Sequence, residues 1–145
     1  MVSRYAWGRG TSPAGAAFGK LSFNNQAGSN ILVKVLKCIV SYPIGGIIGI
    51  TIEGASAGGT QINFTKEYMD GRLSTLGLDP IVDIRFDNSG GLSGHPSRIF
   101  FPANTPITID YESLILGPGA RFHMEAIDAA QEFSATLQWI ETNLR

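Results

Sequence analysis

The chain has few charged residues for its length. They make up 16% of its 145 residues, against roughly 25% in soluble domains. The net charge is −1, so no strong field attracts a phosphate backbone, and we expect no nucleic-acid partner. Because the centres of protein interfaces are depleted of charge, this composition fits a surface that partly faces other subunits. A compact β-domain rich in turns and glycine explains it equally well.

The sequence also lacks cysteine pairs and long apolar runs. Cys38 is the single cysteine, so no internal disulfide forms, and its place in a predicted strand indicates a small buried hydrophobe. The absence of disulfides fits folding in a reducing cytoplasm. Glycines interrupt the most apolar stretch, residues 44–52, so we expect no transmembrane segment and no membrane partner. No apolar run of a signal peptide accompanies Arg4 and Arg9, and we expect a soluble, unsecreted protein.

Residue groupings with catalytic or metal-ligating spacing are missing as well. His95 and His123 lie far apart, and neither has a cysteine or a second histidine at ligand spacing. His123 and Glu125 would share one face of a strand, but a metal site usually needs three or four ligands. A nucleophile built from Cys38, His123 and Asp110 has no local support in the sequence. We therefore expect a protein without enzymatic activity, metal or cofactor.

Alternating apolar and polar residues dominate the last third of the chain. Residues 105–127 alternate, break once at 117–119 (Gly-Pro-Gly) and alternate again. This is the pattern of antiparallel strands joined by a tight turn, with one face buried. The period-two spacing of apolar residues over 132–140 predicts a final strand, although Asp128 would also suit the cap of a helix.

Shorter β-patterns separated by turn signals precede this region. β-branched residues mark them, and prolines fall at their ends or corners. About eight short strands in one chain predict a single all-β domain, an antiparallel β-sandwich of jelly-roll type. Residues 66–77 have room for a helical turn, and 87–96 is a predicted loop. The predicted strands cover residues 31–42, 47–53, 60–65, 81–86, 98–101, 106–116, 121–127 and 132–140.

Residues 1–30 differ from the rest of the chain. They are rich in Gly, Ala and Ser and show neither helical nor strand periodicity, so we predict an extended N-terminal arm over 1–30 and a β-sandwich domain over 31–145. A flexible tail does not usually carry large aromatic residues, so the arm either wraps its own domain or docks on a neighbour. We favour docking, because so many glycines leave few self-contacts to offset the ordering entropy. The predicted partner-binding anchors are Arg4, Tyr5, Trp7, Arg9, Phe18 and Phe23.

Two short segments carry a resemblance to a known class of proteins. They are residues 114–119 (Leu-Ile-Leu-Gly-Pro-Gly) and 139–141 (Trp-Ile-Glu), in a charge-poor β-body behind a Gly-rich arm. In these features the chain resembles tailed-bacteriophage virion proteins built on small jelly-roll or β-sandwich domains. The resemblance implies a virion structural protein made in the host cytoplasm: a capsid cement (decoration) protein, or a tail, neck or fibre component. It also implies a homotrimer that contacts the major capsid protein or another virion protein.

Two other functions stay open at this point. The same architecture supports a carbohydrate- or receptor-binding module, which needs a solvent-facing aromatic residue beside polar groups. The predicted loop 87–96, or Tyr68 with Asp70 and Arg72, would supply such a patch. The second is a small enzyme, which an activity screen with replacement of His123 and Glu125 would test, and we expect no loss of activity.

Overall fold

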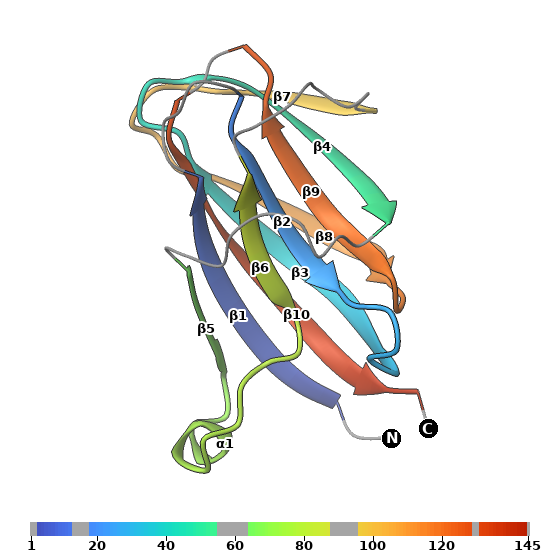
Figure 1. Cartoon of the computed structure of the whole chain (residues 1–145). Helices are drawn as coiled ribbons and strands as arrows, with labels where there is room; N and C mark the ends of the chain where they lie inside the picture. Colours follow the sequence, from blue (N-terminus) through green and yellow to red (C-terminus); the bar gives the residue numbers. More distant parts are fainter. Residues whose placement is uncertain (1–2, 13–17, 55–63, 88–95, 129–130, 145) are drawn as a thin grey trace.

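Two antiparallel β-sheets pack face to face in the computed structural model (Figure 1), which describes residues 3–12, 18–54, 64–87, 96–128 and 131–144. The short helix α1 lies at one end of the sheets, beside β5. The elements are β1 (Ser3–Ser12), β2 (Lys20–Asn25), β3 (Ile31–Ser41), β4 (Gly46–Gly54), β5 (Phe64–Tyr68), α1 (Gly71–Thr75), β6 (Asp83–Asp87), β7 (Ser97–Phe101), β8 (Ile107–Leu116), β9 (Ala120–Ala126) and β10 (Phe133–Asn143).

The strand order is that of a jelly roll. The first sheet runs β5-β1-β10-β3-β8 and the second runs β6-β2-β9-β4-β7. Apart from β6 and β7, consecutive strands alternate between the sheets. When β5 and β6 are set aside, the remaining eight strands have the winding of a double-sheet jelly roll. The prediction of an all-β, jelly-roll-like sandwich is therefore confirmed.

The prediction of an extended N-terminal arm is wrong for β1 and β2. Strand β1 lies inside the first sheet, where it pairs with β10 from Ser3↔Thr142 to Ser12↔Phe133 and with β5 on its other side. Strand β2 pairs with both β6 and β9 in the second sheet. The predicted boundary at residue 30 thus falls between two strands of one jelly roll. These Gly-rich strands are ordered because a neighbouring strand on each side pairs with their backbone N–H and C=O groups.

Small inward residues explain why β1 shows no recognisable period-two pattern. Ala6, Gly8 and Gly10 face the core. A Cβ on Gly8 would lie 2.7 Å from Ile84 Cδ1 and 2.8 Å from Trp139 Cη2. The glycine positions are therefore filled by large side chains from neighbouring strands, and β1 needs no bulky apolar residues of its own.

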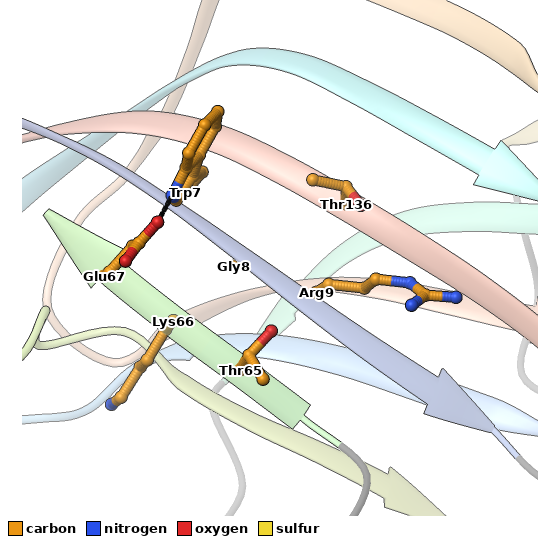
Figure 2. Close-up of a pocket in the computed structure, with 7 residues that line it drawn as sticks. All are labelled: Trp7, Gly8, Arg9, Thr65, Lys66, Glu67 and Thr136. Carbon is orange, nitrogen blue, oxygen red and sulfur yellow. Dashed lines mark hydrogen bonds between the residues drawn. The ribbon is translucent and has the colours of Figure 1, made fainter. Parts of the chain in front are cut away.

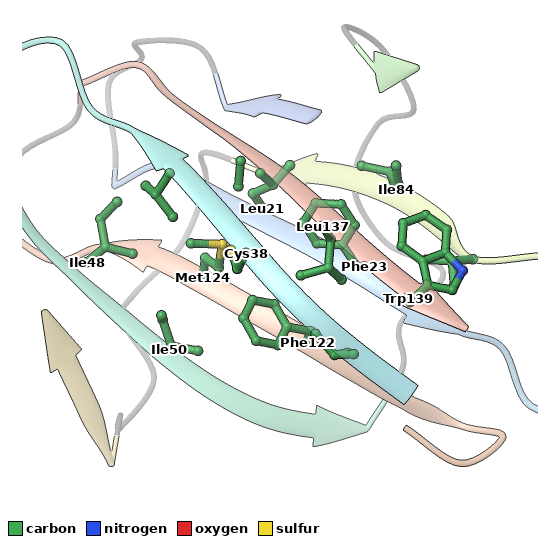
Figure 3. Close-up of a cluster of buried hydrophobic side chains, with 14 of the residues drawn as sticks. Leu21, Phe23, Cys38, Ile48, Ile50, Ile84, Phe122, Met124, Leu137 and Trp139 are labelled. Carbon is green, nitrogen blue, oxygen red and sulfur yellow. The ribbon is translucent and has the colours of Figure 1, made fainter. Parts of the chain in front are cut away.

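The core lies between the sheets and is rich in aromatic side chains (Figure 3). Trp139 on β10 is fully buried, and Phe23 packs edge-on against Phe122 with ring centroids 6.4 Å apart. Cys38 lies in this core, and burial raises the pKa of its thiol to about 12. Its predicted role as a small buried hydrophobe is confirmed.

Several local predictions also hold. Strand β10 covers the predicted final strand from residue 133 onwards, and α1 falls inside the segment with room for a helical turn. Asp128 instead accepts a hydrogen bond from the Ile47 N–H at 2.9 Å. Most of the predicted 87–96 loop and of the predicted 60–65 strand lies outside the described residues. Within the described ranges, no helix has the length and apolar character to cross a membrane.

Candidate functional site

Strand β1 turns its large aromatic side chains away from the core. Tyr5 and Trp7 lie on the outer face of the first sheet and are 53% and 41% exposed. The alternate residues, Ala6 and Gly8, are buried and face inward. This strand therefore presents to solvent the residue types that usually fill a core or an interface. Its outer face is the first place to look for a binding function.

A groove beside Trp7 combines aromatic, charged and hydroxyl groups (Figure 2). It has a volume of about 340 Å³, and β5 and β10 flank β1 on its two sides. The indole Nε1 donates to Glu67 Oε1 at 2.7 Å, which holds the ring in place. The lining residues are Trp7, Gly8, Arg9, Thr65, Lys66, Glu67 and Thr136.

Further hollows continue from this groove towards α1. The N–H of Met69 donates to the Tyr5 carbonyl at 2.9 Å, so the end of β1 and the residue after β5 lie side by side. One hollow is lined by Trp7 and Met69, and the next by Tyr5, Met69 and Leu73. We call the strip formed by Tyr5, Met69 and Leu73 the β1–α1 surface.

Glu141 is a buried carboxylate that joins three parts of the fold at this end. Its Oε1 accepts from the Tyr68 hydroxyl at 2.8 Å. Its Oε2 accepts from Trp139 Nε1 and from the Ile81 N–H, each at 2.9 Å. The side chain ties β10 to β5 and to the segment before β6. Burying a carboxylate is costly unless donors surround it, and here they do.

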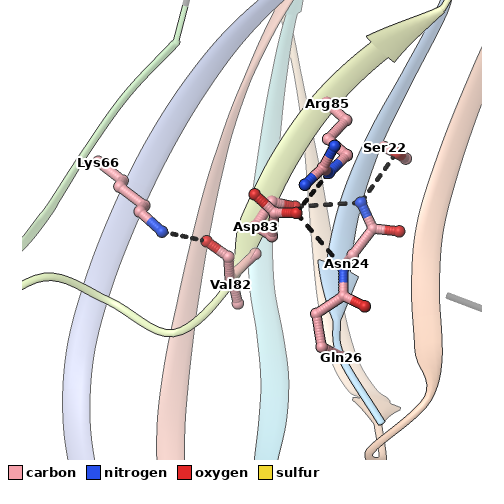
Figure 4. Close-up of polar contacts among 7 residues, drawn as sticks. All are labelled: Ser22, Asn24, Gln26, Lys66, Val82, Asp83 and Arg85. Carbon is pink, nitrogen blue, oxygen red and sulfur yellow. Dashed lines mark hydrogen bonds and ion pairs between the residues drawn. The ribbon is translucent and has the colours of Figure 1, made fainter. Parts of the chain in front are cut away.

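Polar contacts close the edge of the sandwich between β5 and β6 (Figure 4). Lys66 Nζ donates to the Val82 carbonyl at 2.8 Å, and burial lowers the pKa of this ammonium although Asp83, Asp79 and Glu141 oppose the shift. Lys66 pairs with Gly8 in the sheet, so its ammonium is directed away from the Trp7 groove, as Figure 2 shows. The charged side chains of the groove are consequently those of Arg9 and Glu67.

A second polar cluster lies on β9, on the face of the second sheet opposite the core. His123 Nε2 lies 2.8 Å from Glu125 Oε1, and these side chains are 4% and 0% exposed. Arg121 Nη2 donates to Glu53 Oε2 at 2.6 Å. Burial lowers the pKa of His123, although Glu125 and Glu53 oppose the shift. Burial raises the pKa of Glu53, but Arg121 and His123 outweigh this and leave the pKa lowered.

This cluster predicts that the protein loses stability in mild acid. A lowered folded-state pKa of His123 means that the unfolded chain takes up the proton first as the pH falls below about 6.5. The free energy of unfolding should then fall by up to about 1.4 kcal/mol per pH unit for one proton, and Glu53 adds to the loss nearer pH 4. Urea denaturation at a series of pH values measures it. His123→Gln should flatten the profile between pH 7 and 5, whereas equal stability of the natural chain across that range would contradict the prediction.

The structure does not bring the predicted arm anchors together. Arg4, Tyr5, Trp7 and Arg9 lie along β1, whereas Phe18 is half-buried before β2. Phe23 is fully buried in the core, so it does not project as an anchor. Of the six, Tyr5, Trp7 and Arg9 are the exposed ones. The partner residues Glu67 and Met69 gave no signal in the sequence, because they reach β1 only through strand pairing.

The structure does not form the other two residue groups considered from the sequence, the Tyr68 patch and the Cys38 nucleophile. Tyr68 is 4% exposed and hydrogen-bonded to Glu141, so it is not a solvent-facing platform with Asp70 and Arg72. Asp70 instead pairs with Arg72 at 2.8 Å. Cys38 faces the core, whereas Asp110 is exposed and lies 3.8 Å from Lys37.

A metal centre finds no support among the residues that the structure describes. Within them, no group of three or more His, Cys, Asp or Glu side chains is placed to hold an ion. The Trp7 groove and the β1–α1 surface are thus the main candidate sites. No protein-family model, no curated protein and no solved structure matches this chain.

Proposed function

We propose that this protein is a non-enzymatic structural component of a virion, a cement (decoration) protein. It would stabilise the shell by associating with copies of itself and with a neighbouring virion protein. The proposal rests on the jelly-roll fold, the low charge content and the sequence resemblance given above. A tail or fibre component is the alternative station in the particle.

The outward orientation of Tyr5 is the observation that carries this proposal. Aromatic residues are enriched at interface centres and among the residues that dominate binding energy. Tyr5 stands on a rigid strand that pairs on both sides, so little conformational entropy is lost when a partner covers it. Exposed Met69 extends the same apolar strip.

The mechanism differs from docking by a flexible arm. In this proposal, the β1–α1 surface makes the contact, and the strand is already ordered before assembly. Each contact is modest in strength, and several copies on one particle raise the effective concentration of every further contact. No catalytic group takes part; the His123–Glu125 pair is buried and serves stability.

Charge placed on this surface is expected to break assembly without unfolding the chain. Light scattering of the purified natural chain should give a trimer. Tyr5→Arg should weaken association by about 30-fold or more, since an interface aromatic of this kind often contributes about 2 kcal/mol. Far-UV circular dichroism should stay unchanged, because the Tyr5 side chain is exposed.

A matched control uses the same sheet face at its far edge. Thr108 on β8 is exposed, and Thr108→Arg adds the same charge away from the β1–α1 surface. This variant should remain a trimer and should be recovered with particles in a pull-down. A monomeric natural chain that is not recovered with particles would reject the proposal.

A further inference from the structure

The Trp7 groove has a composition that the assembly proposal does not require. An interface patch needs apolar area, whereas this groove is lined by a half-exposed indole, by the Glu67 carboxylate bonded to it and by Arg9 further along β1. Trp7 and Arg9 leave β1 two residues apart and therefore share one face. Thr65 and Thr136 add hydroxyl groups from the strands on either side.

Hydrogen bonding fixes the aromatic platform before any ligand arrives. The bond from Trp7 Nε1 to Glu67 Oε1 is 2.7 Å long and restrains the rotation of the indole. A carboxylate accepts about four hydrogen bonds, so Glu67 keeps capacity for further donors. The platform is preorganised, which lowers the entropy lost on binding.

The charges of the groove select against several ligand classes. Arg9 and Glu67 contribute opposite charges, and the Lys66 ammonium is engaged with Val82 on the other side of β5. A phosphate or sulfate group would meet the Glu67 carboxylate, and an alkyl chain would leave both charges without partners. A neutral ligand with one apolar face and many hydroxyl groups suits all of these groups.

We propose that the Trp7 groove binds a sugar unit of a neutral saccharide. The C–H face of a pyranose ring would pack on the indole. Its hydroxyl groups would donate to Glu67 and accept from Arg9, with Thr65 and Thr136 at the sides. The volume of about 340 Å³ lies at the lower end of the range for small-molecule sites, in keeping with a single ring and part of its neighbour.

The two tryptophans make this inference directly measurable. Trp139 is fully buried and Trp7 is 41% exposed, so acrylamide quenches mainly the fluorescence of Trp7. The probes are four neutral hexasaccharides: of N-acetylglucosamine, β-1,4-glucose, α-1,4-glucose and mannose. At least one should protect Trp7 from quenching, with a dissociation constant of about 0.1–1 mM, typical of a small shallow site.

Three variants separate the groove from other exposed aromatic surface of the protein. Calorimetric titration with the protecting hexasaccharide should show affinity at least about tenfold lower for Trp7→Ala and about tenfold lower for Glu67→Gln. Phe100→Ala is the matched control, since Phe100 is an exposed aromatic residue on β7, outside the groove, and its affinity should be unchanged. The melting temperature of each variant checks that the fold is retained.

Defined results would overturn the inference. They are a lack of protection by all four hexasaccharides at about 10 mM, equal losses for Phe100→Ala and Trp7→Ala, and a Trp7 that acrylamide cannot reach in the natural chain. The last result would assign the groove to an interface between copies. A trimer that binds no saccharide overturns this inference alone, whereas a saccharide-binding monomer that no particle takes up overturns the assembly proposal alone.

Discussion

Replacing Glu141 by leucine is expected to lower the free energy of unfolding by about 3–5 kcal/mol, because each buried donor left without a partner costs about 1–3 kcal/mol. The carboxylate is 3% exposed and accepts from Tyr68, Trp139 and Ile81. Leucine would leave the buried Tyr68 hydroxyl and Trp139 N–H unsatisfied and would remove the acceptor of the part-buried Ile81 N–H. Urea denaturation followed by fluorescence measures the change.

Glu141→Gln provides the graded comparison. The Gln carbonyl still accepts from Trp139 and Ile81, and its NH2 group donates to the Tyr68 oxygen, so the loss should be about 1–2 kcal/mol. Glu112 is exposed on β8, and Glu112→Gln should be neutral within about 0.5 kcal/mol. If Glu141→Leu were as stable as the natural chain, the carboxylate would not be the joint between β10, β5 and the segment before β6.

Gly8→Val is expected to destabilise the fold by about 3 kcal/mol, at the upper end of what overpacking a core costs. The first added carbon alone would meet Ile84 Cδ1 at 2.7 Å and Trp139 Cη2 at 2.8 Å. To relieve the contact with Trp139, the indole would have to move, but Glu141 holds it by a hydrogen bond of 2.9 Å. Thermal unfolding by circular dichroism should show the loss as a lower melting temperature.

The control for this substitution is another glycine with open space around it. A Cβ on Gly117 has no atom of the described residues within 4 Å, so Gly117→Ala should change stability by no more than about 0.5 kcal/mol. A Gly8→Val chain as stable as the Gly117→Ala chain would show that β1 does not lie against Trp139. The position of β1 in the sheet, and with it the outward placement of Trp7, would then be in error.

Strand β1 has small residues on its inner face and aromatic residues on its outer face, and this arrangement connects the fold to the proposed functions. Glycine and alanine occupy the inner face of β1, and large side chains from neighbouring strands fill the core beside them. The aromatic residues of β1 can therefore lie on the outer face without leaving a cavity. Any substitution that restores bulk to the inner face would push β1 away from β2 and β6. The proposed binding surface and the stability of the sandwich therefore depend on the same short strand.

Local patterns were sufficient to predict the architecture. Strands β9 and β10 alternate in a period of two with large apolar residues on one side, as in Phe122, Met124 and Trp139. Such a pattern is a property of neighbouring residues, because successive side chains of a strand point to opposite faces. The turn at Gly117–Gly119 is equally local. The all-β class and the jelly-roll type followed from these signals.

The residues of the candidate site come together only in the tertiary structure. Trp7 meets Glu67 on one side and Gln138 on the other, and no pattern within residues 1–30 indicates either partner. The apolar side chains that cover Gly8 come from β6 and β10. The inner face of β1 therefore lacks large apolar residues of its own, and its sequence shows no period-two pattern. Tyr68, which looks like an exposed aromatic in the sequence, is buried because Glu141 approaches it from the far end of the chain. Strand pairing across long separations, which adjacent residues do not encode, decides which side of a strand meets solvent.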